Sequence, residues 1–169
     1  MIEWHPPPKG GFELSVLKTP VGAMWVIHAA NALVAAEFGS QLPTRYGECG
    51  LAPVSCPEWI QRLVDQAFAG EPLPLWPAAG AGFTPLERIL LSTATEIPFG
   101  TTASYGTVAA WAGYPGRARA AGRAMSRSPI AYLIPTHRVI RSDGRPALCQ
   151  RDSLNRRLRE FEHIDLGGP

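Results

Sequence analysis

The chain has 169 residues, 46% of them hydrophobic, and a formal net charge of +2, a composition ample for a packed core. Its start lacks the basic and apolar regions of a signal peptide, and no apolar run approaches the roughly 20 residues that span a bilayer. Three cysteines are an odd number, which argues against a disulfide framework. We therefore expect a soluble, cytoplasmic protein with free thiols and no membrane contact. We also expect it to be a monomer.

The charge is unevenly distributed along the chain. Residues 1–82 carry four basic and seven acidic side chains, whereas residues 83–169 carry twelve basic and seven acidic ones. Every basic residue of the second half is an arginine, whose planar guanidinium suits contacts with phosphates and bases. A coding bias towards GC, which also favours Ala, Gly and Pro, is the other explanation of this composition.

The first half predicts a small antiparallel sheet. Residues 6–8 are prolines, which indicate an extended, poorly ordered arm, so structure is expected to start after them. Alternating apolar and polar residues separated by turn residues then predict a three-stranded meander. Its strands are expected at residues 12–17, 24–28 and 33–38.

A connection and a helix follow the meander. Residues 39–57 are rich in Pro and Gly, and the spacing of Cys49 and Cys56 within them is not that of a zinc site. Residues 57–69 have apolar side chains at helical spacing and should form a helix that covers the meander. Residues 71–82 have the composition of an interdomain linker. No metal or cofactor is expected.

We place the domain boundary in this linker, so the domains are expected at residues 1–82 and 83–169. In the second domain, Thr84 and Glu87 form a capping box and Ser104 caps the next helix. A tight turn then leads into a third helix, and two short helices joined by a turn form a helix-turn-helix. Helices are expected at residues 84–96, 104–111, 117–126 and 153–164.

The third of these helices has a basic face. Arg119, Arg123 and Arg127 follow one another at intervals of four residues, and no acidic residue stands at a spacing that would pair with them along the helix. Unpaired arginines on the second helix of a helix-turn-helix are typical of duplex binding. The alternative is a solvated face without a partner.

The stretch from Ile134 to Ile140 is the candidate site. An apolar, strand-like run ends at Pro135, which fixes its own φ and offers no N–H, so Thr136 and His137 stand at a sharp exit from the run. Such an exit presents side chains to a pocket. The alternative is a strand end whose polar side chains only satisfy nearby backbone groups.

Four motifs of the second half resemble the O6-alkylguanine-DNA alkyltransferases, also called methylated-DNA–protein-cysteine methyltransferases. They are Ile97-Pro98-Phe99-Gly100, Ser104-Tyr105-Gly106, the run from Ala118 to Met125, and the run from Pro129 to Ile140. The match extends from Phe83 to about His163, and residues 19–22, 36–39 and 67–71 of the first half resemble the same family more weakly. The resemblance implies an α/β (α+β) fold: a ribonuclease-H-like antiparallel sheet with a helix, followed by a mostly helical domain with the helix-turn-helix.

The resemblance also implies roles for individual residues. Arg119 would enter the minor groove in place of the flipped base, and Tyr105 would help to rotate the nucleotide out. The remaining DNA contacts are assigned to Ser104, Arg123 and Arg127. The active-site network would consist of Thr136, His137, Arg138 and Glu162, where the assignment of Glu162 assumes one deleted residue in the preceding loop. The lesion pocket would consist of Met125, Pro135, Thr136, Arg138, Ser142 and Cys149.

The decisive departure from the family is Thr136, which stands where the alkyltransferases have the acceptor cysteine. A threonine alcohol is far less acidic than a thiol, so alkyl transfer to it is not expected. The loop at residues 145–152 and Ser128 also depart from the family pattern. The chain thus resembles the alkyltransferase-like proteins, which bind alkylated guanine without repairing it and flag it for nucleotide excision repair. It differs from them in having threonine where tryptophan is common, and in its N-terminal domain.

The expected function is therefore that of a non-catalytic sensor whose partners are double-stranded DNA with O6-alkylguanine and nucleotide excision repair proteins. Two alternatives stay open. One is an active alkyltransferase that uses Cys149 or Thr136 as the acceptor. The other is a family member with a regulatory or small-molecule role, although the presence of Tyr105 and Arg119 argues against it.

Overall fold

The computed structural model describes residues 1–29, 31–39, 51–80, 82–146 and 152–166. The chain divides into two compact units. Unit 1 comprises Met1–Gly82 together with Pro129–Leu133, and unit 2 comprises Phe83–Ser128 together with Ile134–Pro169. Among the described residues, no helix is both long enough and apolar enough to cross a membrane.

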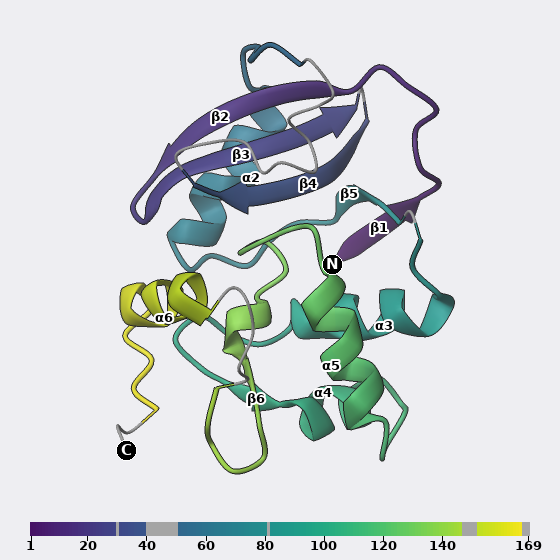
Figure 1. Cartoon of the computed structure of the whole chain (residues 1–169), viewed down its shortest axis with the longest axis vertical. Coiled ribbons are helices and arrows are strands. Elements are labelled where there is room, and N and C mark those ends of the chain that lie inside the picture. The colour runs from purple at the N-terminus through teal and green to yellow at the C-terminus, as the bar shows by residue number, and fades with distance from the viewer. Residues whose placement is uncertain (30, 40–50, 81, 147–151, 167–169) are drawn as a thin grey trace. The chain divides into compact units, whose positions relative to one another are not determined.

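The predicted antiparallel meander of unit 1 is confirmed (Figure 1). Its strands are β2 (Glu13–Thr19), β3 (Gly22–Ala29) and β4 (Ala32–Phe38). At the first turn Gly22 has a φ of +121°, which glycine adopts readily because it lacks a Cβ atom. The hydroxyl of Thr19 donates to the carbonyl of Gly22 at 2.7 Å and closes that turn.

Two more strands complete a five-stranded sheet in the order β1-β5-β4-β3-β2. Strand β1 (Ile2–His5) pairs in parallel with β5 (Trp76–Ala79), and β5 pairs in parallel with β4. The expectations that structure starts only after residue 8 and that residues 71–82 are merely a linker are therefore wrong. Each strand has only four residues, and pairing between segments so far apart leaves no local pattern in the sequence.

The helix predicted in unit 1 is confirmed as α2 (Glu58–Phe68). It starts after Pro57 and ends before Gly70, whose φ is +72°. At its C-terminal end the ring of Phe68 meets Phe38 of β4 edge to face, with centroids 6.4 Å apart. The buried face of the helix consists of Ile60, Leu63, Val64 and Ala67.

Residues 129–133 belong to unit 1, although the chain on either side of them belongs to unit 2. Ala36 of β4 donates its N–H to the carbonyl of Pro129 at 2.9 Å, and its own carbonyl accepts the N–H of Ala131 at 2.8 Å. The pairing is limited to one isolated bridge. The continuous strand expected here is not formed, because Tyr132 has a φ of +69° and turns the chain.

Three helices form the core of unit 2: α3 (Pro85–Ala94), α4 (Tyr105–Trp111) and α5 (Ala118–Arg127). The capping box of Thr84 and Glu87 is present, and the hydroxyl of Ser104 accepts the N–H of Thr107 at 3.0 Å. Helices α4 and α5 with the turn between them form the predicted helix-turn-helix, which is confirmed.

The candidate site lies where the remaining elements of unit 2 meet. The 3₁₀ helix η1 (Thr136–Arg138) leads into β7 (Val139–Ile140), which pairs in parallel with β6 (Ala103–Ser104). The predicted tail helix is confirmed as α6 (Asp152–Phe161), and it packs on η1. The predicted fold class is thus confirmed, with a mixed rather than a purely antiparallel sheet.

Candidate functional site

The chain reaches Thr136 through a tight turn. Pro135 has a φ of −79° and a ψ of 63°, and the N–H of Thr136 donates to the carbonyl of Ile134 at 2.7 Å, which is the hydrogen bond of a γ-turn. The side chain of Thr136 is partly exposed, whereas His137 and Arg138 are buried. The turn therefore leaves Thr136 accessible and directs the next two side chains into unit 2.

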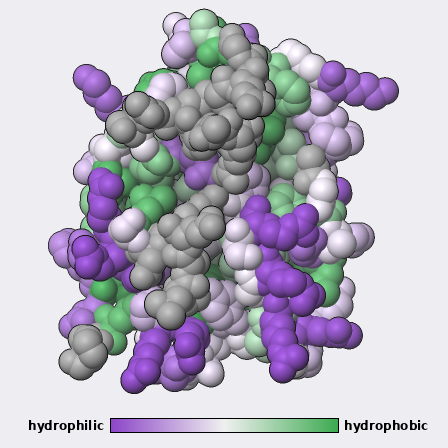
Figure 2. Space-filling model, viewed as in Figure 1, coloured by the Kyte–Doolittle hydropathy of each residue, from purple (hydrophilic) through white to green (hydrophobic). Residues whose placement is uncertain are grey.

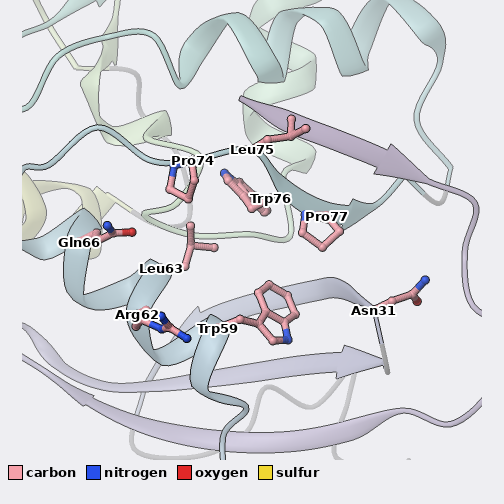
Figure 3. A pocket seen from close by; sticks show the side chains of 9 residues that line it. All are labelled: Asn31, Trp59, Arg62, Leu63, Gln66, Pro74, Leu75, Trp76 and Pro77. Atoms are coloured by element: carbon pink, nitrogen blue, oxygen red, sulfur yellow. The ribbon is translucent and has the colours of Figure 1, made fainter.

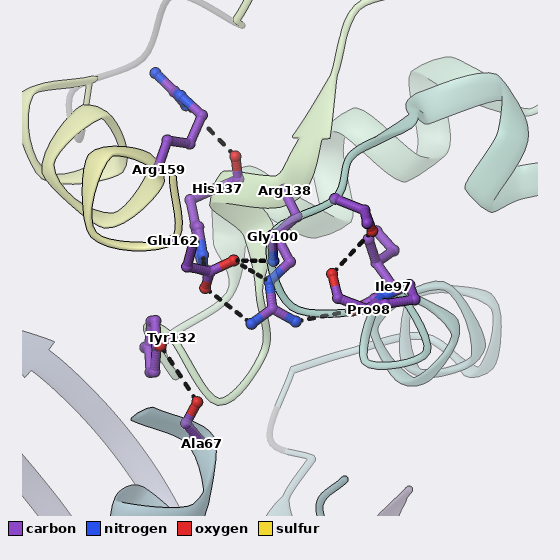
Figure 4. Close-up of polar contacts among 10 residues, drawn as sticks. Ala67, Ile97, Pro98, Gly100, Tyr132, His137, Arg138, Arg159 and Glu162 are labelled. Atoms are coloured by element: carbon purple, nitrogen blue, oxygen red, sulfur yellow. Dashed lines mark hydrogen bonds and ion pairs between the residues drawn. The ribbon is translucent and has the colours of Figure 1, made fainter. Parts of the chain in front are cut away.

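His137 pairs with Glu162 inside unit 2 (Figure 4). The Nε2 atom of His137 lies 2.8 Å from Oε1 of Glu162, and the two side chains are 1% and 0% exposed. Glu162 directly follows the last turn of α6. The structure thus brings together the histidine and the glutamate assigned by the resemblance, beside the position of Thr136.

Arg138 binds the same carboxylate through two parallel hydrogen bonds. Its Nε donates to Oε2 of Glu162 and its second terminal nitrogen donates to Oε1, both at 2.8 Å. The other terminal nitrogen donates to the carbonyl of Ile97 at 2.8 Å. Because the guanidinium is buried and used in this way, Arg138 organises the site rather than reaching towards a ligand.

The protonation states follow from these contacts. Burial opposes the ionisation of Glu162, but hydrogen bonds from His137 and Arg138 outweigh it and lower the pKa of this carboxyl to about 2. Burial lowers the pKa of His137, although its contact with Glu162 acts in the opposite direction. At neutral pH the pair therefore consists of a carboxylate and a neutral imidazole. The Nε2 proton of the imidazole is directed at Glu162, which leaves Nδ1 as an acceptor.

Sequence reasoning missed two supports of this network. The N–H of Gly100 donates to Oε2 of Glu162 at 3.1 Å, and Arg159 donates to the carbonyl of His137 at 3.4 Å. Gly100 has a φ of +73°, and a Cβ atom there would lie 3.3 Å from the backbone oxygen of Glu162. The sequence pointed to Gly100 only through its place at the end of the Ile97–Gly100 motif. Glycine suits this position because it tolerates both the positive φ and the close approach of the Glu162 backbone.

The arginine face of α5 is only partly free. Hydrophilic side chains gather over the part of unit 2 that contains α5 (Figure 2). Arg119 and Arg123 are exposed, and within the described part of the chain neither guanidinium has an ion-pair or hydrogen-bond partner. Arg127 instead pairs with Glu87 of α3 at 2.6 Å. The expectation that all three arginines are unpaired is therefore wrong, because the partner comes from another helix and not from a neighbouring turn.

Tyr105 and Ser104 stand at the start of α4. The ring of Tyr105 lies next to Gly122 of α5, where a Cβ atom would be 4.0 Å from two ring carbons. This contact places Tyr105 against the helix turn between Arg119 and Arg123. The hydroxyl of Ser104 caps α4 and lies 2.8 Å from that of Thr107, so its contacts are within the helix-turn-helix.

The residues assigned to the lesion pocket differ in exposure. Met125 and Pro135 are buried, and Ser142 is exposed in a turn. Cys149 lies outside the described residues. Among the residues that the structure describes, no three His, Cys, Asp or Glu side chains gather in a way that could hold a metal ion.

Unit 1 has a separate cavity of about 530 Å³ between α2 and the segment that enters β5 (Figure 3). Most of its lining is apolar or aromatic. Of the described residues that line it, Arg62 alone is charged, and it forms an exposed pair with Glu58 at 3.2 Å. The lining residues are Asn31, Trp59, Arg62, Leu63, Gln66, Pro74, Leu75, Trp76 and Pro77.

Residues 85–164 match the family model of the 6-O-methylguanine DNA methyltransferase DNA-binding domain. The methylated-DNA–protein-cysteine methyltransferase of Shigella flexneri is 32% identical over 140 residues, covering 76% of this chain and 81% of that protein. The corresponding protein of Methanothermobacter thermautotrophicus is 44% identical over 88 residues, covering 52% of this chain. The match spans about half of that relative, 49% of its length.

A crystal structure of Mycobacterium tuberculosis OGT in complex with DNA is similar to this chain over most of its length. The TM-score is 0.69 and the sequence identity is 26%, with 89% of this chain and 93% of that chain covered. The similarity therefore includes the sheet of unit 1 as well as the helices of unit 2.

Proposed function

Because this chain belongs to the O6-alkylguanine-DNA alkyltransferase family, we propose that it binds double-stranded DNA containing O6-alkylguanine and does not transfer the alkyl group. The observation that carries the proposal is Thr136, at the position of the family's acceptor cysteine. Next to it, the buried pair of His137 and Glu162 is retained at 2.8 Å. The site thus keeps the groups that surround the acceptor and lacks the thiol.

The chemistry of threonine supports the absence of transfer. A free thiol has a pKa of about 8.5 and can be ionised by a neighbouring base, whereas an alcohol is far less acidic. The Nε2 proton of the neutral His137 is directed at Glu162, and a neutral imidazole is too weak a base to form an alkoxide. The oxygen of Thr136 is also crowded by its β-branch. Thr136 would therefore line a pocket for the alkyl group.

The exposed cations of α5 support DNA binding. Arg119 and Arg123 are exposed, and Tyr105 packs against the same helix. That the similar Mycobacterium tuberculosis protein was crystallised in complex with DNA is consistent with this role. In the proposed complex Arg119 enters the minor groove and takes the place of the flipped base. Arg123 supplies a phosphate contact.

A protein that holds the lesion without removing it must pass it on. We propose that this chain acts as a monomer in the cytoplasm and hands O6-alkylguanine to another repair pathway, such as nucleotide excision repair. The long-lived complex, rather than a chemical product, is then the signal that other repair proteins read.

A salt titration with two duplexes tests the proposal. One duplex carries a single O6-methylguanine, and its twin is unmodified. We expect the methylated duplex to bind more tightly at every salt concentration, with similar slopes for both, because the phosphate contacts are shared. Equal affinities across the titration would show that phosphate contacts alone explain the binding, and they would overturn the proposal.

Two other functions make different predictions. If Cys149 is the acceptor, the wild-type protein gains the mass of one methyl group from the methylated duplex and a Cys149→Ser variant does not. If the chain has a small-molecule role, the apolar cavity of unit 1 is the observation that favours it, and neither duplex then binds above the level of a neutral control protein. The paired titration and the mass of the recovered protein separate the three functions.

A further inference from the structure

The segment that precedes Thr136 contains a buried tyrosine in an unusual backbone conformation. Tyr132 has a φ of +69°, and only 2% of the residue is exposed. The N–H of Leu133 donates to the carbonyl of Ala131 at 2.9 Å, so Tyr132 is the central residue of a γ-turn. A bulky residue rarely adopts positive φ, and it persists there only when its surroundings hold it.

The surroundings of Tyr132 come from the C-terminal end of α2, within unit 1. The ring of Tyr132 stacks on Phe68, with centroids 4.0 Å apart and an angle of 17° between the planes. Its hydroxyl donates to the backbone carbonyl of Ala67 at 3.3 Å (Figure 4). Phe68 is itself braced edge to face by Phe38 of β4. The ring and the hydroxyl of Tyr132 therefore both contact the end of α2.

The backbone before the turn is fixed independently. The two hydrogen bonds of Ala36 hold the carbonyl of Pro129 and the N–H of Ala131 on β4. After the turn, Leu133, Ile134 and Pro135 are all buried. The path from the anchored turn to Thr136 is thus short, and the φ of Pro135 is restricted by its ring.

We propose that Tyr132 is a positioning residue for the Thr136 pocket. By holding its own turn on α2, Tyr132 sets the path of the chain into the second γ-turn, which is centred on Pro135, and so the direction in which Thr136 is presented. Tyr132 would thus contribute to lesion recognition through the path of the chain alone, without touching the DNA. The inference rests on the proposed function, since lesion preference is its consequence.

The test compares four single variants, and the double variant of Tyr132→Leu with Phe68→Leu, with the wild-type protein. Tyr132→Leu removes the stacking and the hydroxyl, whereas Tyr132→Phe removes only the hydroxyl, and Phe68→Leu removes the stacking from the other side. Ile27→Val is the matched control, because Ile27 lies in a buried cluster with Leu14 and Ala35 that does not include Tyr132. Two quantities are measured: the ratio of affinities for the methylated and unmodified duplexes, and the amide hydrogen exchange of Leu133 and Thr136 without DNA.

We expect Tyr132→Leu and Phe68→Leu each to lower the affinity ratio by about twofold to tenfold, the range that a lost aromatic pair implies. Binding of the unmodified duplex stays unchanged, because the arginine face is not affected. The Thr136 amide exchanges faster in both variants. The effects of the two substitutions are not additive, since they remove the same contact. Tyr132→Phe should change the affinity ratio and the exchange rate in the same direction but by less. If Tyr132→Leu does not fold, the comparison rests on Tyr132→Phe and Phe68→Leu.

Two outcomes overturn the proposal. One is an unchanged exchange rate at Thr136 in both Tyr132→Leu and Phe68→Leu, whatever the DNA result. The other is an affinity ratio that falls equally in Ile27→Val, because the effect would then come from general loss of stability. If the wild-type protein itself shows no lesion preference, the proposed function fails, and the exchange rates still decide whether Tyr132 holds the turn.

Discussion

Arg138 and Glu162 face each other through two parallel hydrogen bonds of 2.8 Å each, and both side chains are buried. A guanidinium and a carboxylate in this arrangement fix each other's orientation more strictly than a single contact would. The same carboxylate accepts hydrogen bonds from His137 and from the N–H of Gly100. Glu162 is therefore the group on which the residues beside Thr136 depend.

Replacing this carboxylate should destabilise unit 2. In Glu162→Gln the guanidinium of Arg138 stays buried without a counter-charge, and we expect the free energy of unfolding to fall by about 3 kcal/mol. Urea unfolding followed by circular dichroism measures this. The matched control is Glu160→Gln, which removes an exposed pair with Arg156 and should change stability by less than about 0.5 kcal/mol. Similar small losses in both variants would contradict the network described here.

The pKa of Glu162 makes stability depend on pH in the acidic range. Burial opposes its ionisation, but hydrogen bonds from His137 and Arg138 lower its pKa from 4.5 to about 2. A lowered carboxyl pKa gives stability that is present above pH 4.5 and is lost as the pH falls towards 2. The loss can reach about 3 kcal/mol. Urea unfolding at a series of pH values should show this step in the wild-type protein, and its persistence in Glu162→Gln would assign it to other groups.

As the pH falls, His137 should lower the stability of the protein before Glu162 does. Burial lowers its pKa below 6.5 in the folded state, so the unfolded chain takes up a proton first and stability falls once the pH drops below 6.5. The slope of unfolding free energy against pH should be smaller in His137→Asn. It should not vanish, because burial also lowers the pKa of His28. An unchanged slope would mean that His137 takes up its proton over the same pH range in the folded and the unfolded chain, and it would contradict the lowered pKa.

Arg127 and Arg123 should behave differently although they lie on the same helix. Arg127→Gln breaks the pair with Glu87 and should lower stability, with little effect on DNA affinity. Arg123→Gln should leave stability unchanged, weaken binding to both duplexes, and reduce the slope of log K against log salt by about 1. Thermal unfolding and a salt titration of each variant check this. The reverse pattern would place the DNA contact on Arg127.

A single substitution should restore alkyl transfer. In Thr136→Cys a thiol stands beside the retained His137 and Glu162, and thiolate attack becomes possible near neutral pH. After incubation with the methylated duplex, this variant should gain the mass of one methyl group. Thr136→Ser is the control, because a less crowded alcohol still lacks the acidity of a thiol. A Thr136→Cys protein that binds the lesion and gains no mass would show that the pocket no longer aligns an acceptor.

Local patterns were sufficient to predict most helices and the exit at Pro135. Capping residues such as Thr84 and Ser104 act within one helical turn, so they can be identified from residues close to them in the sequence. His137 was singled out for the same reason, since it follows the proline that ends an apolar run. The pairing with Glu162 needed the family resemblance, because nothing local connects two residues in different elements.

The features that the sequence did not predict are those that depend on distant partners. Glu87 and Arg127 are 40 positions apart, and strands β1 and β5 are too short to show a pattern of their own. The positive φ of Tyr132 contradicts the preference of its residue type. It follows from contacts with Phe68 and Ala67 that only the folded chain reveals.

The central claim is that this site recognises an alkyl group and leaves it in place. It is tested most directly by recovering the wild-type protein from a prolonged incubation with the O6-methylguanine duplex and measuring the intact masses of protein and DNA. We predict that the protein is bound to the duplex and that both masses are unchanged. A protein that carries one methyl group in place of a proton, with the duplex lighter by the corresponding mass, would contradict the claim.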